Sequence, residues 1–439
     1  MSRHWTGEAC HSRDGHEGVD VVRIAIVGSG VSGLVCAHLL RRDHDVTLFE
    51  ADARAGGHAH TLVVTLEGGV HAVDTGFIVY NERNYPVITS LFDELGVVTR
   101  PSDMSFAMSD DAARVEWCGT SLATVFAQRR NLVRPAFLRM LVDVVRFNRS
   151  ARRLLDETEN LGYTLEEFLQ RGHYSSAFVD WYLVPMGAAI WSADPEEFLR
   201  FPAAAFIRFF DNHGLLGVRD RPQWRTVVGG SVQYVNAITS SLGDGLRLAT
   251  PVRAITRLDD GVSVRTDDGV EFFDHVVVAT HSDQALALLD DPTDAERDVL
   301  GAISYSSNDA TLHTDERLMP RRVRARASWN WRRRPGARAA TLTYDLTRLE
   351  GLETARPVYL TLNQSDAVDP ALVLAQMTYR HPVFDSRAMA AQRRHGEISG
   401  RGATSYVGAY WGFGFHEDGA RSAVLACRTL DVGVAEGVS

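Results

Sequence analysis

The apolar residues between positions 22 and 50 follow first a strand pattern, then a helix pattern, then a strand pattern again. Residues 24–27 are consecutively apolar, as in a buried strand, and residues 34–40 carry apolar side chains at helical spacing. A second apolar run, residues 45–49, ends at Glu50. The order strand, helix, strand is typical of a βαβ unit, which the pattern therefore predicts here.

The next part of the chain alternates between helix and strand patterns. A hairpin is expected over 61–65 and 70–73, a helix over 86–95, strands around 104–117, and helices over the arginine-rich segment 121–155. The aromatic stretch 178–216 contains Pro185, Pro195 and Pro202, which are expected to break it into short helices, with Asp194 as an N-cap. This stretch is expected to form the core of a helical cap; an apolar substrate tunnel is the alternative.

The second half of the chain predicts more strands. A helix is expected over 232–242, strands over 246–252 and 254–258, a hairpin over 261–269 and a buried strand over 274–280. Residues 294–394 predict a mixed sheet with strands over 339–344 and 358–362. The arginine-dense loop 321–338 is expected to be a solvated hairpin, with an anion or lipid-headgroup contact as the alternative.

Glycines at fixed spacing follow the first strand. Gly28, Gly30 and Gly33 form a G-x-G-x-x-G pattern that opens the predicted helix. In a dinucleotide-binding turn the first glycine permits the tight bend, the second lets a pyrophosphate approach the backbone, and the third lets helix and strand pack closely. The helix N-terminus then holds the phosphate charge, and an acid at the end of the second strand accepts hydrogen bonds from a ribose. The residues expected around the nucleotide are Gly28, Ser29, Gly30, Val31, Ser32, Gly33, Glu50 and Ala51.

The continuation of the motif separates two classes of protein. A methyltransferase would also place glycines after its first strand. However, residues 50–57 form an E-x-x-x-R-x-G-G run, which resembles the flavoprotein superfamily of amine oxidases, phytoene-type desaturases and protoporphyrinogen oxidase. In that superfamily the segment wraps the adenosine and pyrophosphate of FAD. The resemblance implies that Arg54, Gly56, Gly57 and His58 also contact FAD, with His58 standing where the family usually has an arginine.

Further segments resemble the same superfamily in chain order. Thr75 and Gly76 lie in a D-x-G turn of the kind that approaches the flavin, with an ordinary Asp-led turn as the alternative. The resemblance implies an adenine contact at Val252, a nucleotide contact at Ala279 and Thr280, and a flavin contact in the last motif at Gly408, Tyr410, Phe415, His416, Glu417 and Asp418. In that motif a helix N-terminus faces the flavin edge that becomes negative on reduction. No cysteine lies between Cys118 and Cys427, so the FAD is expected to be noncovalent.

These features together predict an α/β fold, in which a Rossmann-like FAD-binding domain carries an inserted α+β substrate domain. The FAD-binding domain is assigned to residues 20–85, 225–295 and 395–436, and the substrate-binding cap to 86–224 and 296–394, after a disordered leader over 1–20. The runs G-G-H-x-H-T, N-H-G-L-L, H-P-V-F-D and G-F-H-E-D-G resemble a bacterial NAD/FAD-binding branch of the superfamily. Members of that branch are associated with cyclopropane-fatty-acid-synthase-like methyltransferases. The resemblance implies a lipid acyl substrate and a lipid-modifying methyltransferase partner.

Composition narrows the function further. The net charge is −10, which does not favour nucleic-acid binding. All 46 basic residues are arginines, so lysine chemistry, such as a Schiff base, is excluded. The four cysteines show no C-x-x-C spacing, which predicts no metal site and fits a reducing, cytoplasmic location. Arginines dominate the charge of residues 121–155, which is typical of a solvated helix face; a peripheral contact at the inner membrane face is the alternative.

The expected chemistry is hydride transfer from a substrate C–H bond to flavin N5. His58, His381 and His416 are the candidates for a catalytic base. The favoured function is desaturation or dehydrogenation of an apolar, lipid-like substrate. One alternative is an amine oxidase, in which Tyr410 and Trp411 would flank the flavin. A second is a non-catalytic flavin protein that acts as the partner of a lipid-modifying enzyme.

Overall fold

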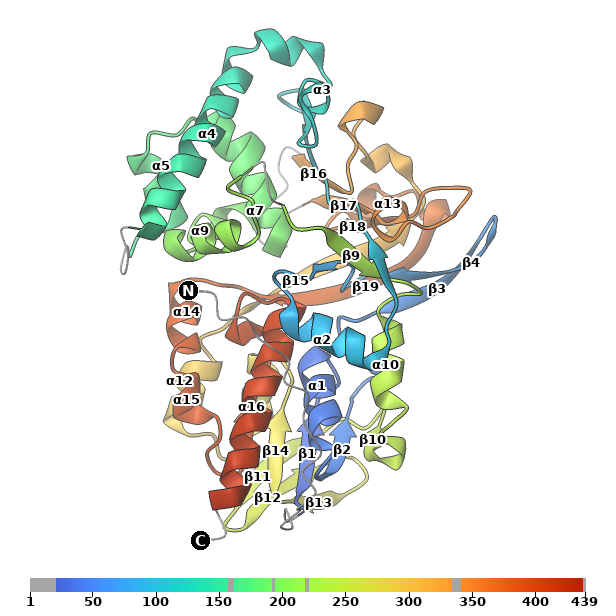
Figure 1. Cartoon of the computed structure of the whole chain (residues 1–439), viewed down its shortest axis with the longest axis vertical. Helices are drawn as coiled ribbons and strands as arrows, with labels where there is room; N and C mark the ends of the chain where they lie inside the picture. The colour runs from blue at the N-terminus through green and yellow to red at the C-terminus, as the bar shows by residue number, and fades with distance from the viewer. Residues whose placement is uncertain (1–20, 157–161, 192–193, 218–220, 334–340, 437–439) are drawn as a thin grey trace.

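The computed structural model describes residues 21–156, 162–191, 194–217, 221–333 and 341–436, so the expected leader lies outside the described residues. A five-stranded parallel sheet of order β10–β2–β1–β14–β20 fills the lower half of the molecule (Figure 1). Its strands are β1 (Arg23–Val27), β2 (Asp45–Phe49), β10 (Leu246–Arg247), β14 (His275–Val278) and β20 (Thr404–Tyr406). The predicted βαβ unit is confirmed, and strands from distant parts of the sequence complete the same sheet.

Both faces of this sheet are covered, because alternate residues of each strand pack into different layers. Ile24 and Ile26 pack beneath helices, whereas Ala25 and Val27 pack against a second layer on the other side. The first layer contains α1 (Val31–Leu40), α2 (Pro86–Leu95), α10 (Val232–Thr239) and α16 (His416–Glu436). The second contains the antiparallel strands β11 (Ala254–Leu258), β12 (Gly261–Arg265) and β13 (Val270–Phe273), with α11 (Ser282–Leu288), α12 (Asp294–Leu300), α14 (Ser386–Gln392) and α15 (His395–Ile398).

A larger, seven-stranded sheet lies in the middle of the molecule, in the order β19–β15–β18–β17–β16–β7–β8. Only β16 and β7 pair in parallel; every other neighbour is antiparallel. The strands are β7 (Phe106–Asp110), β8 (Val115–Cys118), β15 (Tyr305–His313), β16 (Trp329–Arg333), β17 (Leu342–Asp345), β18 (Tyr359–Leu362) and β19 (Val373–Pro382), with α13 (Leu346–Glu350) after β17.

Two smaller sheets connect these parts. The hairpin of β3 (Thr61–Leu66) and β4 (Gly69–Asp74) was predicted and is confirmed. The other small sheet has the order β5–β9–β6, with β5 (Tyr80–Asn81), β6 (Thr99–Pro101) and β9 (Trp224–Val227). The chain passes from the parallel sheet to the larger one through these strands, so the two sheets enclose a space between them.

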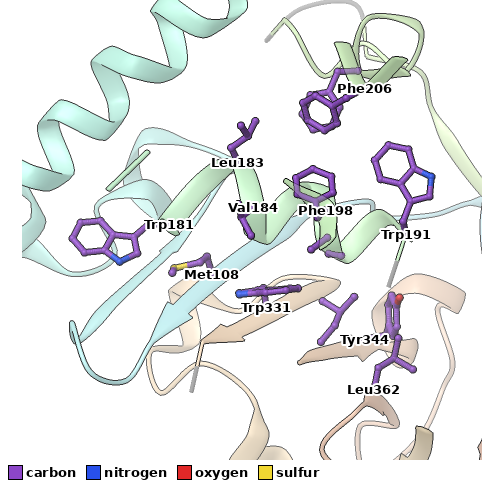
Figure 2. Close-up of a cluster of buried hydrophobic side chains, with 14 of the residues drawn as sticks. Met108, Trp181, Leu183, Val184, Trp191, Phe198, Phe206, Trp331, Tyr344 and Leu362 are labelled. Atoms are coloured by element: carbon purple, nitrogen blue, oxygen red, sulfur yellow. The ribbon is translucent and has the colours of Figure 1, made fainter. Parts of the chain in front are cut away.

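Helices cover the upper side of the seven-stranded sheet (Figure 1). They are α3 (Leu122–Val125), α4 (Pro135–Asp156), α5 (Leu165–Arg171), α6 (Ser176–Phe178), α7 (Val184–Trp191), α8 (Pro195–Phe198) and α9 (Ala203–Asn212), with the 3-10 turn η1 (Arg129–Val133) before α4. Figure 2 shows Val184 on α7 above Met108 and Trp331 of the sheet, with Phe198 beside it and Phe206 above Phe198. The described part of the aromatic stretch 178–216 therefore contributes to the core, as expected, and some of its side chains also face a cavity.

Three local expectations were wrong. Pro185 does not separate two helices, because the π-helical segment η2 (Val179–Leu183) joins α6 to α7 and its widened turn accommodates the proline ring. Of the strand expected over 246–252, only β10 forms. Within the expected loop 321–338, residues 329–333 form β16 at the centre of a sheet, and residues 334–338 lie outside the described residues.

The α/β fold class is confirmed, whereas the exact domain boundaries stay a prediction. The expected N-cap of Asp194 is present, since its side chain accepts hydrogen bonds from the amides of Glu196 and Glu197. Among the helices of the described residues, none combines the length and the apolar character that a bilayer-spanning helix needs.

Candidate active site

One cavity of about 1380 Å³ extends from the carboxyl ends of the parallel strands to the underside of the helical cap. A single ligand commonly occupies a pocket of roughly 300–1,000 Å³, so this space can hold more than one. Its walls come from both sheets and from α1, α4, α7, α9 and α16. The cavity divides into a glycine-rich end, a middle lined by histidines, and an apolar end beneath α4 and α7.

The glycine-rich end is built by the turn from β1 into α1. Gly28 has a φ of +101°, which other residues rarely adopt. A Cβ atom at Gly33 would lie 1.9 Å from the Gly28 carbonyl oxygen, so helix and strand pack as closely as the motif predicts. In contrast, a Cβ atom at Gly30 would point into open space. Because Gly30 is the N-cap of α1 and has no side chain to bond the helix amides, those amides are available to an anion.

Glu50 stands at the end of β2 with an ordered carboxylate. Its Oε2 atom accepts hydrogen bonds from the amide of Ser29 at 2.9 Å and from the Ser29 hydroxyl at 2.5 Å. Its Oε1 atom accepts one from the Asp52 amide at 2.9 Å. These bonds hold the acid beside the glycine turn, where the sequence predicts a ribose. Ala51, Val252, Ala279 and Thr280 line the same end of the cavity.

The segment after Glu50 contributes fewer wall residues than the resemblance implies. Gly57 and His58 line the cavity, but Arg54 and Gly56 do not. Gly56 instead donates its amide to the Ser29 carbonyl oxygen at 3.0 Å, and its φ of +116° requires glycine. Arg54 leaves its Nη1 atom buried without a hydrogen-bond partner. Gly56 therefore positions the turn, and its predicted contact with FAD stays a prediction.

The middle of the cavity is ordered by a tyrosine that the sequence analysis did not identify. The hydroxyl of Tyr379, on β19, lies 2.7 Å from the Thr75 hydroxyl and 2.8 Å from Nδ1 of His60. Thr75 and Gly76 line the cavity, and a Cβ atom at Gly76 would lie 2.1 Å from the His58 carbonyl oxygen. The D-x-G turn thus approaches the cavity, as the resemblance implies.

Three histidines meet beside Tyr379. The ring of His58 lies 5.5 Å from that of His381, 6.1 Å from that of His281 and 5.1 Å from that of Tyr379, measured between centroids. Asn308 donates a hydrogen bond to Nδ1 of His381 at 3.0 Å. Burial lowers the pKa of His58 well below its ordinary value and that of His381 to about 4. Both imidazoles are therefore neutral at pH 7.

His416, the third candidate base, occupies a different setting. Its ring is stacked on Phe77 at 3.8 Å between centroids, and its Nε2 atom lies 3.2 Å from the hydroxyl of Tyr234. Burial lowers its pKa to about 3. The structure therefore brings His58 and His381 together and packs His416 against Phe77.

The last motif splits into wall residues and supporting residues. Gly408, Tyr410, Phe415 and His416 line the cavity, and His416 begins α16, so the positive end of that helix dipole faces the cavity. Glu417 and Asp418 do not line it.

Both acids instead bind backbone amides. The Glu417 carboxylate accepts hydrogen bonds from the amides of Val87 and Ile88 at the start of α2, and Asp418 accepts from those of Phe413 and Phe415. Of Tyr410 and Trp411, which are expected to flank a flavin in an amine oxidase, only one lines the cavity. Tyr410 lines the cavity, whereas Trp411 does not and packs on His395 at 4.3 Å between ring centroids.

The far end of the cavity is apolar. It is lined by Phe106, Trp117, Met140, Leu141, Val144 and Met186, which come from the sheet, α4 and α7. Phe209 stacks on both Phe415 and His213, at 5.2 and 3.9 Å between ring centroids, and all three line the wall. His213 bonds the Phe209 carbonyl oxygen through Nδ1, as expected of a satisfied histidine. Among the described residues, Glu50 and Asp103 are the only carboxylates that line the cavity, and Asp103 is exposed at its rim.

Asp74 and Glu350 form a buried acid pair beneath the site. The Asp74 carboxylate accepts hydrogen bonds from the amide and hydroxyl of Ser231, which precedes α10, and the Glu350 carboxylate accepts from the Asp74 amide. Burial raises the pKa of Asp74 to about 6 and that of Glu350 well above its usual range. Because Glu350 and Tyr379 are distant in sequence from Asp74 and Thr75, no local pattern could have found these contacts.

Several buried polar atoms around the cavity have no hydrogen-bond partner within the described residues. They are Nε2 of His58, Nδ1 of His281 and the hydroxyl of Tyr410. Leaving such atoms unpaired is costly, so each fits a position where a bound group would complete the bonding. Together with the open space at Gly30 and the ordered Glu50, they fit an elongated, phosphate-bearing cofactor such as the FAD that the motifs predict.

Comparison with known proteins agrees with this geometry. The family model described as flavin containing amine oxidoreductase matches residues 31–370. A Mycobacterium tuberculosis protein assigned as the flavin-containing monoamine oxidase AofH is 28% identical over 287 residues, which are 62% of this chain and 59% of that protein. The match thus spans less than two thirds of that relative.

Solved structures share the fold at lower identity. Cyclohexylamine oxidase from Brevibacterium oxydans superposes with a TM-score of 0.68 at 15% identity, over 94% of this chain and 100% of that one. A fatty acid isomerase from P. acnes that produces CLA superposes with a TM-score of 0.66 at 16% identity, over 93% and 98%.

Proposed function

The chain belongs to the flavin-containing amine oxidoreductase family, and from this premise we propose that it is an FAD-dependent oxidoreductase that dehydrogenates an apolar acyl chain. FAD is the cofactor that this family and the site support. The residues that would hold it are those of the glycine-rich end and the middle of the cavity: Gly28, Gly30, Glu50, Gly57, His58, Thr75, Gly76, Val252, Ala279, Gly408 and Phe415. Cys36, Cys118 and Cys427 are buried and none lines the cavity, which supports a noncovalent cofactor.

When bound, FAD supplies the acceptor for a hydride from a substrate C–H bond. The remaining steps belong to the protein. The cavity walls orient the chain and exclude water, and the N-terminus of α16 favours negative charge at the site. Desaturation also releases a proton, and Nε2 of His58 is buried, unpaired and central, so we assign the proton to that atom. His381, held by Asn308, positions the His58 ring.

The lining of the far end of the cavity is the observation that supports an apolar acyl substrate. An ammonium group buried there would need a carboxylate or another counter-charge, since unpaired buried charges are strongly disfavoured. The only acid on that part of the wall, within the described residues, is Asp103, whose side chain is about half exposed and lies 3.8 Å from the Arg348 guanidinium. Phe106, Met140 and Met186 instead offer the apolar surface that an acyl chain would bury.

An amine substrate is the second candidate, and the names of two relatives favour it. Anaerobic mixing of the flavin-loaded protein with each substrate class separates the two. Acyl phospholipid in detergent micelles should bleach the flavin absorbance, whereas cyclohexylamine and putrescine should leave it oxidised. Bleaching by the amines alone would overturn the acyl assignment. Oxidised flavin with every compound would support the third reading, a non-catalytic flavin partner of a lipid-modifying enzyme.

We also propose a partner enzyme and a cellular lipid substrate. A lipid-modifying methyltransferase would use an unsaturated acyl chain, so we propose it as the enzyme that works beside this one. Mass spectrometry of the lipids from cells with and without the protein tests both, because loss of the protein should change acyl unsaturation. An unchanged lipid profile with altered amine pools would contradict the proposal.

A further inference from the structure

Large apolar side chains are exposed in an unusual concentration around the start of α4. Of the eighteen such side chains exposed in the described residues, six lie between positions 122 and 145. Leu122, Leu132 and Val133 precede α4 and are 79, 52 and 79% exposed. A gathering of this kind on a protein surface marks a site of interaction.

Helix α4 is apolar on two opposite sides. Leu138, Val142 and Val145 follow helical spacing and are exposed, whereas Met140 and Val144 face inward and line the cavity. A helix that only covered a core would keep its outer side polar. The outer side of α4 thus exposes apolar side chains to water, and only the thickness of the helix separates it from the cavity.

A second segment extends this surface with the same composition. The short helix η5 (Val323–Ala325) contacts α3, and Val323 is 73% exposed between Arg322 and Arg324. The arginines of this stretch are the ones for which the sequence offers an anion or lipid-headgroup contact as an alternative. We use the name apolar–basic platform for the exposed residues of 122–145 together with 321–324. Two segments that are distant in sequence, α3 and η5, thus lie in contact, and each exposes an aliphatic side chain.

The charge of the platform indicates which kind of surface it binds. Arg129, Arg130, Arg321, Arg322 and Arg324 form no ion pair with a carboxylate among the described residues. Asp143, the only acid in segment 121–155, is buried and already bonded to Arg139 and Arg146. Unpaired arginines interleaved with aliphatic side chains, on a chain of net charge −10, complement anionic headgroups above an acyl layer. The cores of protein–protein interfaces are, in contrast, enriched in aromatic side chains, whereas the exposed large apolar residues of the platform are leucines and valines.

The cavity opens beside this surface. Gly119 and Thr120, which immediately precede α3, line the cavity and are exposed. Strands β11–β13 lie at the opposite end of the molecule (Figure 1). We propose that the apolar–basic platform docks on the surface of an anionic lipid bilayer, so that an acyl chain can pass from the bilayer into the cavity beside α3. The path of the chain rests on the proposed acyl substrate, but the docking itself does not.

Sedimentation of the full-length, flavin-loaded protein with vesicles tests the docking. Vesicles of phosphatidylcholine and phosphatidylglycerol in equal amounts should carry the protein down, and vesicles of phosphatidylcholine alone should not. The double variant Leu132→Asp with Val133→Asp should lower the partition coefficient by more than about tenfold. The triple variant Arg129→Gln, Arg130→Gln and Arg322→Gln should lower it by roughly fivefold for each arginine, and added salt should mimic this loss.

Matched variants at the other end of the molecule provide the controls. Val270→Asp with Phe272→Asp changes two exposed apolar residues of β13, and Arg41→Gln with Arg428→Gln removes two exposed arginines. Both controls should bind vesicles as the wild type does, and an unchanged flavin spectrum shows that each variant is folded.

The result that overturns the proposal is binding that does not depend on the platform. Equal binding of the platform and control variants would do so, as would absence of binding to the anionic vesicles. Self-association of the wild type that Leu132→Asp abolishes, without vesicle binding, would identify a second copy as the occupant instead. Bleaching of flavin by micellar acyl lipid is measured separately, so the docking can fail while the proposed activity stands, or the reverse.

Discussion

The two ends of the cavity are specified by the sequence in different ways. At the glycine-rich end the backbone makes the site. A side chain at Gly28 or Gly33 would meet backbone atoms, and a side chain at Gly30 would fill the space expected for the pyrophosphate. At the apolar end side chains make it, since Phe106, Met140 and Met186 come from three separate elements and share only their hydrophobicity. A site built by backbone geometry has a short sequence motif, whereas a site built by packing has none.

This difference decides what can vary. Hydrophobic residues of similar volume can replace one another in a packed wall at small cost, so the apolar end can change its shape while the fold is kept. The glycine turn has no such freedom, because added atoms at Gly28 and Gly33 would meet backbone. We therefore expect substitutions at the two ends to separate cofactor binding from substrate selection.

The largest expected effect is at Gly33, and it is a test of the backbone-built end. Gly33→Val places a Cβ atom within 1.9 Å of the Gly28 carbonyl oxygen and should lower the free energy of unfolding by about 3 kcal/mol or more. Gly30→Val should leave the stability of the cofactor-free protein within about 1 kcal/mol, because its Cβ atom points into open space.

Thermal unfolding of the cofactor-free proteins, followed by titration with FAD, measures both effects. Gly30→Val should lose FAD affinity by more than tenfold, or about 1.4 kcal/mol, despite its retained stability. If Gly30→Val binds FAD as the wild type does, then a cofactor does not approach the turn as the motif predicts.

The glycine-rich end is also the part that could be predicted from sequence. The strand before the motif, the helix after it and the position of Glu50 are local properties, and all were confirmed. Arg54, Glu417 and Asp418 were assigned to the cofactor by resemblance alone, and the structure places them outside the cavity wall. For Glu417 the reason is a bond to α2, which no pattern around residue 417 encodes.

Contacts between distant segments account for the rest of what was missed. The arginine-dense stretch before Trp329 concealed β16, whose residues Asn330 and Trp331 are both buried because neighbouring strands cover it on two sides. Tyr379 reaches Thr75 and His60 only after the two sheets have come together. The apolar character of 178–216 was evident, but whether it formed core or wall depended on which helix face met the cavity.

An intermediate effect is expected at the packed end, where Met186 lines the wall. Met186→Trp fills part of the cavity and should raise KM for an acyl substrate about tenfold, because the displaced chain loses roughly 1.4 kcal/mol of apolar contact. Met186→Leu, which nearly conserves volume, should behave as the wild type does. Steady-state kinetics together with the flavin content of each protein make the measurement; loss of flavin from Met186→Trp would mean that the two ends are not separable.

The smallest effect is expected at Glu417, where a residue attributed to the cofactor serves the fold. Burial raises the pKa of Glu417 to about 7 from an ordinary 4.5, so the folded protein holds a proton that the unfolded chain releases. The stability associated with that proton is complete below pH 4.5 and is lost as the pH rises through 7.

Glu417→Gln removes this titration but keeps an oxygen that can accept from one α2 amide. The variant should therefore be less stable than the wild type by about 1 kcal/mol at pH 4.5, where the wild-type carboxyl is protonated, and the deficit should shrink or reverse by pH 8. Denaturant unfolding across this range measures it, with FAD affinity as the second readout. An unchanged affinity assigns Glu417 to the packing of α16 on α2, while a tenfold loss would return it to the cofactor site and weaken the distinction between wall and support.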